Sequence, residues 1–152
     1  MVIRILIFLI INFGGLAIGS YFTGNGVSSE WYQQLHKAPW TPPGWVFGFA
    51  WTTIMLCFSL YMSLVWKSTN NQLMLLSMFV ISWILNVLWN PVFFHFQFTT
   101  LGLAIILLLT LVIGWFLFAT FHHVRYKVIL VAPYFLWLLI ATSLNAFIVF
   151  KN

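Results

Sequence analysis

The fold of this chain is decided by residues 68–124, which read STNNQLMLLSMFVISWILNVLWNPVFFHFQFTTLGLAIILLLTLVIGWFLFATFHHV and contain no Asp, Glu, Lys or Arg. A membrane-spanning helix needs about 20 mostly apolar residues, so this run is too long for one span and must fold back on itself. Residues 90–100, which begin with Asn-Pro and end with Thr-Thr, are the natural place for the turn. The run therefore predicts two membrane helices, near 71–92 and 98–120.

Further charge-free runs cover residues 5–29, 38–66 and 128–150. An ionised side chain at the centre of a span costs about 2.5–3.5 kcal/mol, so such runs are candidates for spans. Of the 152 residues, 63% are hydrophobic and 5% are charged. Soluble domains carry about 25% charged residues, and a soluble monomer is therefore excluded. We expect an all-α integral membrane bundle, a single domain over 1–152, with five helices near 4–22, 44–66, 71–92, 98–120 and 127–149.

The Lys and Arg residues divide between the two sides of such a bundle and predict its orientation. One side has Arg4, Lys67, Arg125 and Lys127, and the other has Lys37 and Lys151. Cytoplasmic loops carry an excess of these residues, so we expect the N-terminus inside the cell and the C-terminus and the 23–43 loop outside. The basic residues sit at helix ends rather than in a clustered stripe, which argues against binding to nucleic acid.

The first expected helix leaves two alternatives open. Gly15 and Gly19 form a small-x-x-x-small pair, which permits close helix packing either in a dimer or within one bundle. Arg4 and the small residues at 17–19 also resemble a signal peptide with its cleavage site. The apolar stretch continues past that site to Phe22, which favours an uncleaved span.

The connection 23–43 is long for a compact bundle, and it leads into residues 40–51, which read WTPPGWVFGFAW. Paired prolines suit a helix start, and tryptophans suit the boundary between water and lipid. Ser28 or Ser29 is expected to cap a short helix that runs through Tyr32. Loops of this length are frequently lids or binding loops. An interfacial segment anchored by its aromatic residues is the plain alternative.

Polar residues recur every four positions in the third expected helix. Ser82, Asn86 and Asn90 share one face, and Trp89 lies beside them. Unpaired amides are costly in hydrocarbon, so this face must meet other helices or a cavity. Interhelical hydrogen bonding and a ligand pocket both satisfy that requirement.

The fifth expected helix repeats the spacing of four with Pro133, Trp137, Ala141 and Asn145. A small residue one turn from a tryptophan leaves room beside the ring for a flat apolar ligand or for a neighbouring helix. Pro133 is expected to kink this helix or to loosen its first third.

Several kinds of site are excluded by the residues that the chain lacks. Glu30 is the single carboxylate, so there is no pair of acids for general acid–base catalysis and no acidic cluster for a hard metal. The adjacent His122 and His123 point about 100° apart on a helix and do not form a chelating pair. We therefore expect no metal site and no covalently bound cofactor. No ionisable residue lies at mid-membrane, which argues against a proton-coupled pump.

Three segments in order resemble the tryptophan-rich sensory protein/translocator protein family, the TspO/MBR family, which is also called the peripheral-type benzodiazepine receptor family. The segments are residues 31–51, containing KAPWTPP at 37–43; residues 85–94, LNVLWNPVFF; and residues 133–145, with PYFLW running into ATSLN at 141–145. The resemblance covers essentially the whole chain. It implies a five-helix bundle, commonly dimeric, with a ligand cavity open toward the long first loop.

Members of that family bind porphyrins, and eukaryotic members also bind steroids and isoquinoline or benzodiazepine drugs. Our candidate ligand-binding residues are Tyr32, Trp51, Asn86, Trp89, Asn90, Trp137, Ala141 and Leu144. Trp89 and Asn90 come from the polar face of the third helix, and the resemblance implies the others. Tyr32 would come from the covering loop.

We therefore expect a membrane receptor or sensor that binds a protoporphyrin-like tetrapyrrole, with Trp51 and Trp137 stacking on its ring. One alternative is an enzyme that degrades porphyrin with light and oxygen, in which these two indoles would be the catalytic groups. A porphyrin transporter is the other alternative, although the sequence shows no inverted repeat.

The resemblance has one gap, in the sterol-recognition pattern of animal members. That pattern needs a tyrosine near the C-terminus, but Ala146 and Phe147 precede Lys151 here, so we expect no tight sterol binding. The expected partners are membrane lipid, a porphyrin or drug-like ligand and a second copy of the chain. The lack of a clear transit peptide favours a bacterial cell membrane.

Overall fold

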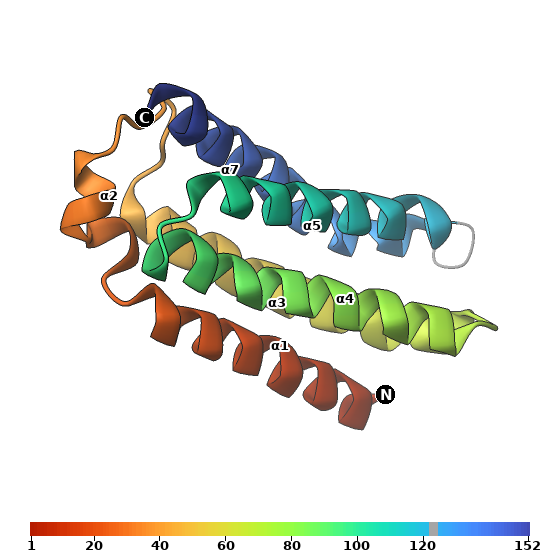
Figure 1. Ribbon diagram of the computed structural model, residues 1–152. Helices are drawn as coiled ribbons and strands as arrows, with labels where there is room; N and C mark the ends of the chain where they lie inside the picture. Colours follow the sequence, from red (N-terminus) through yellow and green to blue (C-terminus); the bar gives the residue numbers. More distant parts are fainter. Residues whose placement is uncertain (122–124) are drawn as a thin grey trace.

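The computed structural model describes residues 1–121 and 125–152, and these residues form helices and turns without a β-strand (Figure 1). The His122–His123 pair lies outside the described residues. Within these two ranges, five helices are long and apolar enough to cross a membrane, which confirms the all-α, five-helix prediction. They are α1 (Val2–Thr23), α3 (Gly44–Ser68), α4 (Gln72–Asn90), α5 (Thr99–Ala119) and α7 (Ala132–Lys151).

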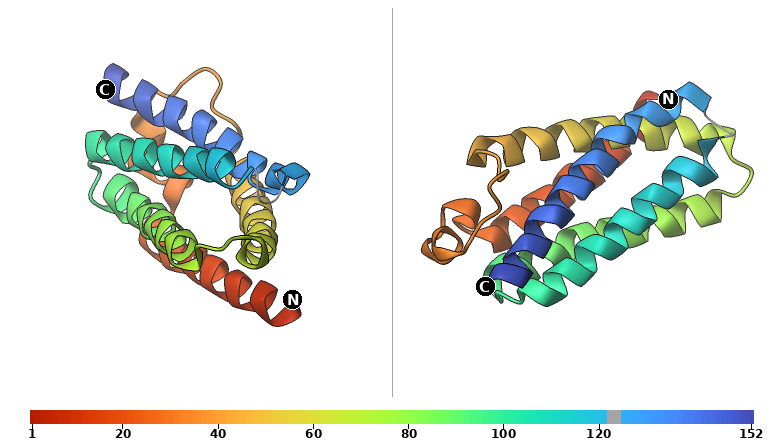
Figure 2. Two further views of the ribbon diagram at one scale, coloured as in Figure 1. Left: turned by 90° about the vertical axis from the view of Figure 1, so that its right-hand side faces the viewer. Right: turned by 90° about the horizontal axis from the view of Figure 1, so that it is seen from above.

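The five helices form a closed ring. α1 contacts α3 and α4, α5 contacts α4 and α7, and α7 returns to contact α3. Figure 2 shows the ring from two further directions, and Figure 1 shows that the two chain termini lie at opposite ends of the bundle. The covering loop, with η1 (Gly26–Ser28) and α2 (Glu30–Gln34), lies at the same end as the C-terminus. We call this the loop end.

Pro91 and Pro133 lie where one type of helix gives way to another. Pro91 ends α4 and begins η2 (Pro91–His95), a short π-helical segment in the expected turn. Pro133 lies in the first turn of α7 rather than inside a longer helix, so the expected kink is wrong. An amide at a helix start has no intrahelical partner, and proline is therefore well tolerated there. The preceding residues form a 3-10 helix, η3 (Arg125–Leu130), so the first third of the expected helix is looser, as predicted.

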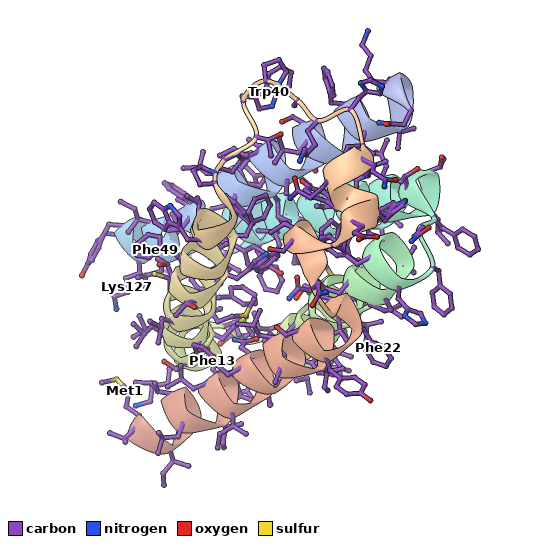
Figure 3. All side chains as sticks on the ribbon, turned by 90° about the vertical axis from the view of Figure 1, so that its left-hand side faces the viewer. Met1, Phe13, Phe22, Trp40, Phe49 and Lys127 are labelled. Carbon is purple, nitrogen blue, oxygen red and sulfur yellow. The ribbon has the colours of Figure 1, made fainter. Side chains whose placement is uncertain are left out.

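Hydrogen bonds hold the covering loop, both within the loop and between the loop and the C-terminal part of the chain. The Ser29 hydroxyl accepts a hydrogen bond from the Tyr32 amide at 3.3 Å, which confirms the predicted cap of the short helix. The side chain of Asn152 bonds both the amide and the carbonyl of His36, at 2.8 and 3.2 Å. The Trp40 indole donates to the Ser143 hydroxyl at 3.1 Å. Figure 3 shows Trp40 at the crest of the loop, above the end of the bundle.

α1 packs on α4 through its glycines near the loop end. A Cβ on Gly15 would overlap the Trp83 indole, and a Cβ on Gly19 would lie 2.6 Å from the Asn90 amide nitrogen. The Thr23 hydroxyl donates to the side-chain oxygen Oδ1 of Asn90 at 2.8 Å. This small-x-x-x-small pair therefore packs within the bundle, which was one of its two predicted uses.

The contacts between α1 and α3 lie at the opposite end. The Asn12 amide donates to the buried Ser59 hydroxyl at 2.8 Å, and the Phe8 and Trp66 rings lie 6.2 Å apart. Beyond Ser59 the interior is filled, with Phe58 packed among other aromatic rings. Because α1 leans on α4 at the loop end, space remains there between α1 and α3.

Candidate ligand-binding cavity

That space is a cavity of about 350 Å³ between α1, α3 and α4. Pockets that bind small molecules measure about 300–1,000 Å³, so the cavity is at the small end of this range. Its lining residues are Leu16, Ser20, Thr23, Gly24, Asn25, Gly26, Val27, Phe47, Gly48, Trp51, Thr52, Asn86, Trp89, Asn90 and Phe94. The lining is mostly apolar and aromatic, with a few polar groups.

Four of the candidate residues meet in this cavity. Trp51 comes from α3, and Asn86, Trp89 and Asn90 come from one face of α4. The Trp89 indole N–H donates to the side-chain oxygen Oδ1 of Asn145 at 3.2 Å, which fixes the orientation of the indole ring. The cavity is thus bordered by the indoles of Trp51 and Trp89 and by the polar side chains of Asn86 and Asn90.

The two asparagines of the cavity differ in their hydrogen bonding. The Asn90 side chain accepts from Thr23 and donates to the backbone carbonyl of Asn86 at 3.3 Å, so it is used in holding α1 on α4. The Asn86 side chain is 7% exposed and has no hydrogen-bond partner in the described ranges. Its amide atoms remain accessible from the cavity, so a ligand there can replace water as their hydrogen-bond partner.

Three other candidates lie apart from this cavity, around a void of about 20 Å³ toward α7. Tyr32, Ala141 and Leu144 line the void, and it shares Phe47, Trp89 and Phe94 with the larger cavity. The structure therefore places the candidate residues around two neighbouring hollows.

Trp137 lines neither hollow. Its indole is 7% exposed, and its ring meets the edge of Phe47 with centroids 5.4 Å apart. Trp51 lies in the cavity and contacts Tyr134 edge-on at 6.0 Å. The expected pair of stacking indoles is thus divided in this structure, with Phe47 in front of Trp137.

A third hollow, which we call the vestibule, lies under the covering loop and has a volume of about 440 Å³. It is lined by residues in the segments 27–33 and 37–44 and by Phe47. The Lys37 ammonium lies 5.4 Å from the centroid of the Tyr32 ring and donates to the side-chain oxygen Oε1 of Gln33 at 2.8 Å. Burial raises the pKa of Tyr32, so its phenol is neutral near pH 7. The vestibule thus has a positive charge at its edge.

Sequence reasoning missed the turn at residues 23–27 and Phe47, which also form the cavity. Phe47 precedes Trp51 by four residues and therefore shares its helix face, which was the available signal. The turn needs Gly24 and Gly26 because both have positive φ, 56° and 51°. Several lining residues are exposed, and they place the mouth between α1 with its turn and α3: Ser20, Gly24, Asn25, Gly48 and Thr52.

Comparisons with known proteins agree with this architecture. The model of the TspO/MBR family matches residues 7–150. A tryptophan-rich sensory protein from Cereibacter sphaeroides is 33% identical over 76% of this chain and 73% of its own length. The tryptophan-rich protein TspO of Archaeoglobus fulgidus is 32% identical over 100% of this chain and 96% of its own. The human translocator protein is 30% identical over 86% and 79%. With five apolar helices and a family match along nearly its full length, this chain belongs to the TspO/MBR family of membrane proteins.

Proposed function

We propose that this protein is a membrane receptor for a flat, largely apolar ligand of the porphyrin type, which binds in the cavity between α1, α3 and α4. One observation carries the proposal, namely the pair of indole walls with an unpaired amide between them. Trp51 and Trp89 both border the cavity, where a flat ligand could stack on Trp51 and on the face of Trp89 that is not stacked on Phe93, and Asn86 offers a hydrogen bond at the ligand edge.

The position of the mouth fits a ligand that partitions into lipid. The exposed lining residues lie on α1 and α3, two membrane helices, and in the turn that follows α1. The residues at the far end of the bundle are packed, with Phe58, Tyr61 and Phe116 at most 1% exposed. Access from one end of the bundle favours a receptor over a transporter, which needs access from both sides.

The photo-oxidative alternative has less support in the geometry. It assigns electron transfer to Trp51 and Trp137 together, but only Trp51 borders the cavity. Trp137 does not line the cavity and contacts Phe47, which does. A receptor requires only that the ligand be held, and the indoles of Trp51 and Trp89 border the cavity for that purpose.

The proposal is tested by titrating protoporphyrin IX into the purified protein in lipid nanodiscs while the Soret band is recorded. Trp51→Leu is expected to weaken binding by about tenfold, because an aromatic contact is worth about 0.5–1.5 kcal/mol beyond its buried area.

Trp45→Leu is the matched control, since Trp45 belongs to the same helix but is 71% exposed and lies outside the cavity lining. It should bind as the wild type does. Equal affinity of all three proteins, or a wild type that leaves the Soret band unshifted, would contradict the proposal.

A further inference from the structure

Phe47 lies where the cavity, the void and the vestibule meet. Its side chain belongs to the lining of the 350 Å³ cavity, of the 20 Å³ void and of the 440 Å³ vestibule. No other residue in the described ranges lines all three. The ring is half-buried and lies in the first turn of α3.

The neighbour of Phe47 is a buried polar group without a partner. The indole nitrogen of Trp137 is inaccessible and has no hydrogen-bond partner in residues 1–121 and 125–152. Buried tryptophan N–H groups usually find a partner, and an orphaned donor costs about 1–3 kcal/mol. The Phe47 ring contacts the Trp137 ring edge-on with centroids 5.4 Å apart, and Phe47 lines the adjoining hollows whereas Trp137 does not.

We propose that Phe47 is a movable partition that sets the size of ligand the protein accepts. In the observed rotamer the cavity is limited to about 350 Å³ and suits a small aromatic molecule. Rotation of the ring joins the cavity, the void and the vestibule into one chamber and uncovers the Trp137 donor. The inference rests on the proposed function for its ligand class, but the movement of the ring can be tested without a ligand.

The joined chamber fits a particular chemistry. Its inner part has indole faces and two donors or acceptors, Asn86 and Trp137, which suit a flat ring system with polar atoms. Its outer part is lined by Lys37 of the covering loop, whose ammonium suits a carboxylate. An extended aromatic dicarboxylate such as protoporphyrin would span both parts, whereas an uncharged isoquinoline carboxamide would occupy the inner part alone.

The ligand-free test measures hydrogen exchange of the Trp137 indole N–H by NMR in protein labelled with ¹⁵N-tryptophan, with the signal assigned by Trp137→Phe. Phe47→Ala should accelerate exchange by about tenfold or more, since a minor open state is typically about 0.1–10% populated and the truncation makes it permanent. Phe47→Leu, which keeps the core filled, should lie between. Phe49→Ala is the control, because Phe49 is 65% exposed and points away from the bundle (Figure 3).

The ligand test compares two probes on the same variants. For protoporphyrin IX, Phe47→Ala should tighten binding by about tenfold, since apparent affinity scales with the fraction of the binding-competent state. Phe47→Trp, which enlarges the partition, should weaken it. The isoquinoline carboxamide should change by less than about threefold in both, because it does not need the open state.

The two tests separate the partition from the receptor proposal. Unchanged Trp137 exchange in Phe47→Ala would overturn the partition, whatever the porphyrin result. Wild-type protein that binds no porphyrin while Phe47→Ala accelerates exchange would contradict the receptor and support the partition. If both probes shift equally in the Phe47 variants, the ring is an ordinary wall of the site and the proposal fails.

Discussion

At the scale of single residues, the polar face of α4 shows how equal spacing can serve different purposes. Ser82 donates to the carbonyl of Phe79 within its own helix at 2.8 Å. Asn90 holds α1, and Asn86 alone of the three has a free side chain within the described residues. The sequence predicted either interhelical hydrogen bonding or a pocket for this face. The structure shows both, one turn apart, because Asn90 bonds Thr23 of α1 while Asn86 lines the cavity. The partners of each side chain, rather than its spacing, make the difference.

This difference predicts opposite phenotypes for two identical substitutions. Asn86→Leu removes an amide that has no hydrogen-bond partner in the described residues, so thermal stability should be unchanged or higher while porphyrin binding weakens by about 3- to 10-fold, the value of one hydrogen bond. Asn90→Leu removes the hydrogen bond that joins α1 to α4 and leaves the Thr23 hydroxyl only the Gly19 carbonyl in its own helix, so it should lower stability by about 0.5–1.5 kcal/mol. Thermal unfolding in detergent together with Soret titration measures both effects. Stability lost in Asn86→Leu and retained in Asn90→Leu would reverse the assignment.

At the scale of helices, the position of α1 creates the cavity. α1 contacts α3 through Asn12 and Ser59 and then turns onto α4, where Gly15 and Gly19 allow close approach. The Trp83 indole donates to the carbonyl of Ile11 at 2.9 Å across the same contact. The cavity between α1 and α3 therefore depends on Gly15 and Gly19, which have no side chains that would hold α1 away from α4.

Neighbouring glycines in α1 provide a matched test of this packing. Gly15→Ala places a methyl group against the Trp83 indole and should lower stability by about 1–3 kcal/mol, the usual effect of overpacking. Gly14→Ala meets nothing within 4 Å and should be neutral or slightly stabilising, because alanine favours the helix. Unfolding midpoints of the two variants in the same detergent give the comparison. A larger loss for Gly14→Ala would show that α1 does not pack on α4 in this way.

The helices themselves could be predicted from the sequence because hydrocarbon tolerates few charges and each span must be long enough to cross it. The start of α7 could not, because Pro133 is compatible with a kink or with a first turn, and packing selects the first turn. The cavity walls Trp51, Trp89 and Asn86 were also accessible to prediction from spacing and resemblance. The separation of Trp137 by Phe47 was not, since it depends on the rotamer of one ring among three hollows.

At the scale of the whole molecule, the ring of helices places the covering loop and the C-terminus at one end and the N-terminus at the other (Figure 1). The larger group of Lys and Arg residues belongs to the N-terminal end by chain order. We therefore predict that the N-terminal end faces the cytoplasm.

Cysteine labelling in a Cys57→Ser background tests this orientation in bacterial cells. Gln34→Cys, in α2, should react with a membrane-impermeant maleimide in intact cells. Gln72→Cys, at the first residue of α4, should react only after the membrane is permeabilised. The reverse pattern would mean that the loop and the cavity mouth lie on the cytoplasmic side.

The central claim is that a porphyrin lies between Trp51 and Trp89 at the loop end. Its most direct test is paramagnetic broadening by manganese(III) protoporphyrin in protein with ¹⁵N-labelled tryptophan, in which each of the nine indole N–H groups is a separate probe. Trp66 lies on α3 about 22 Å along the helix from Trp51, by a rise of about 1.5 Å per residue, and Trp115 lies near the end of α5. We predict that the Trp51 and Trp89 signals broaden while those of Trp66 and Trp115 remain sharp. Sharp signals from Trp51 and Trp89, or equal broadening of all four, would contradict the account.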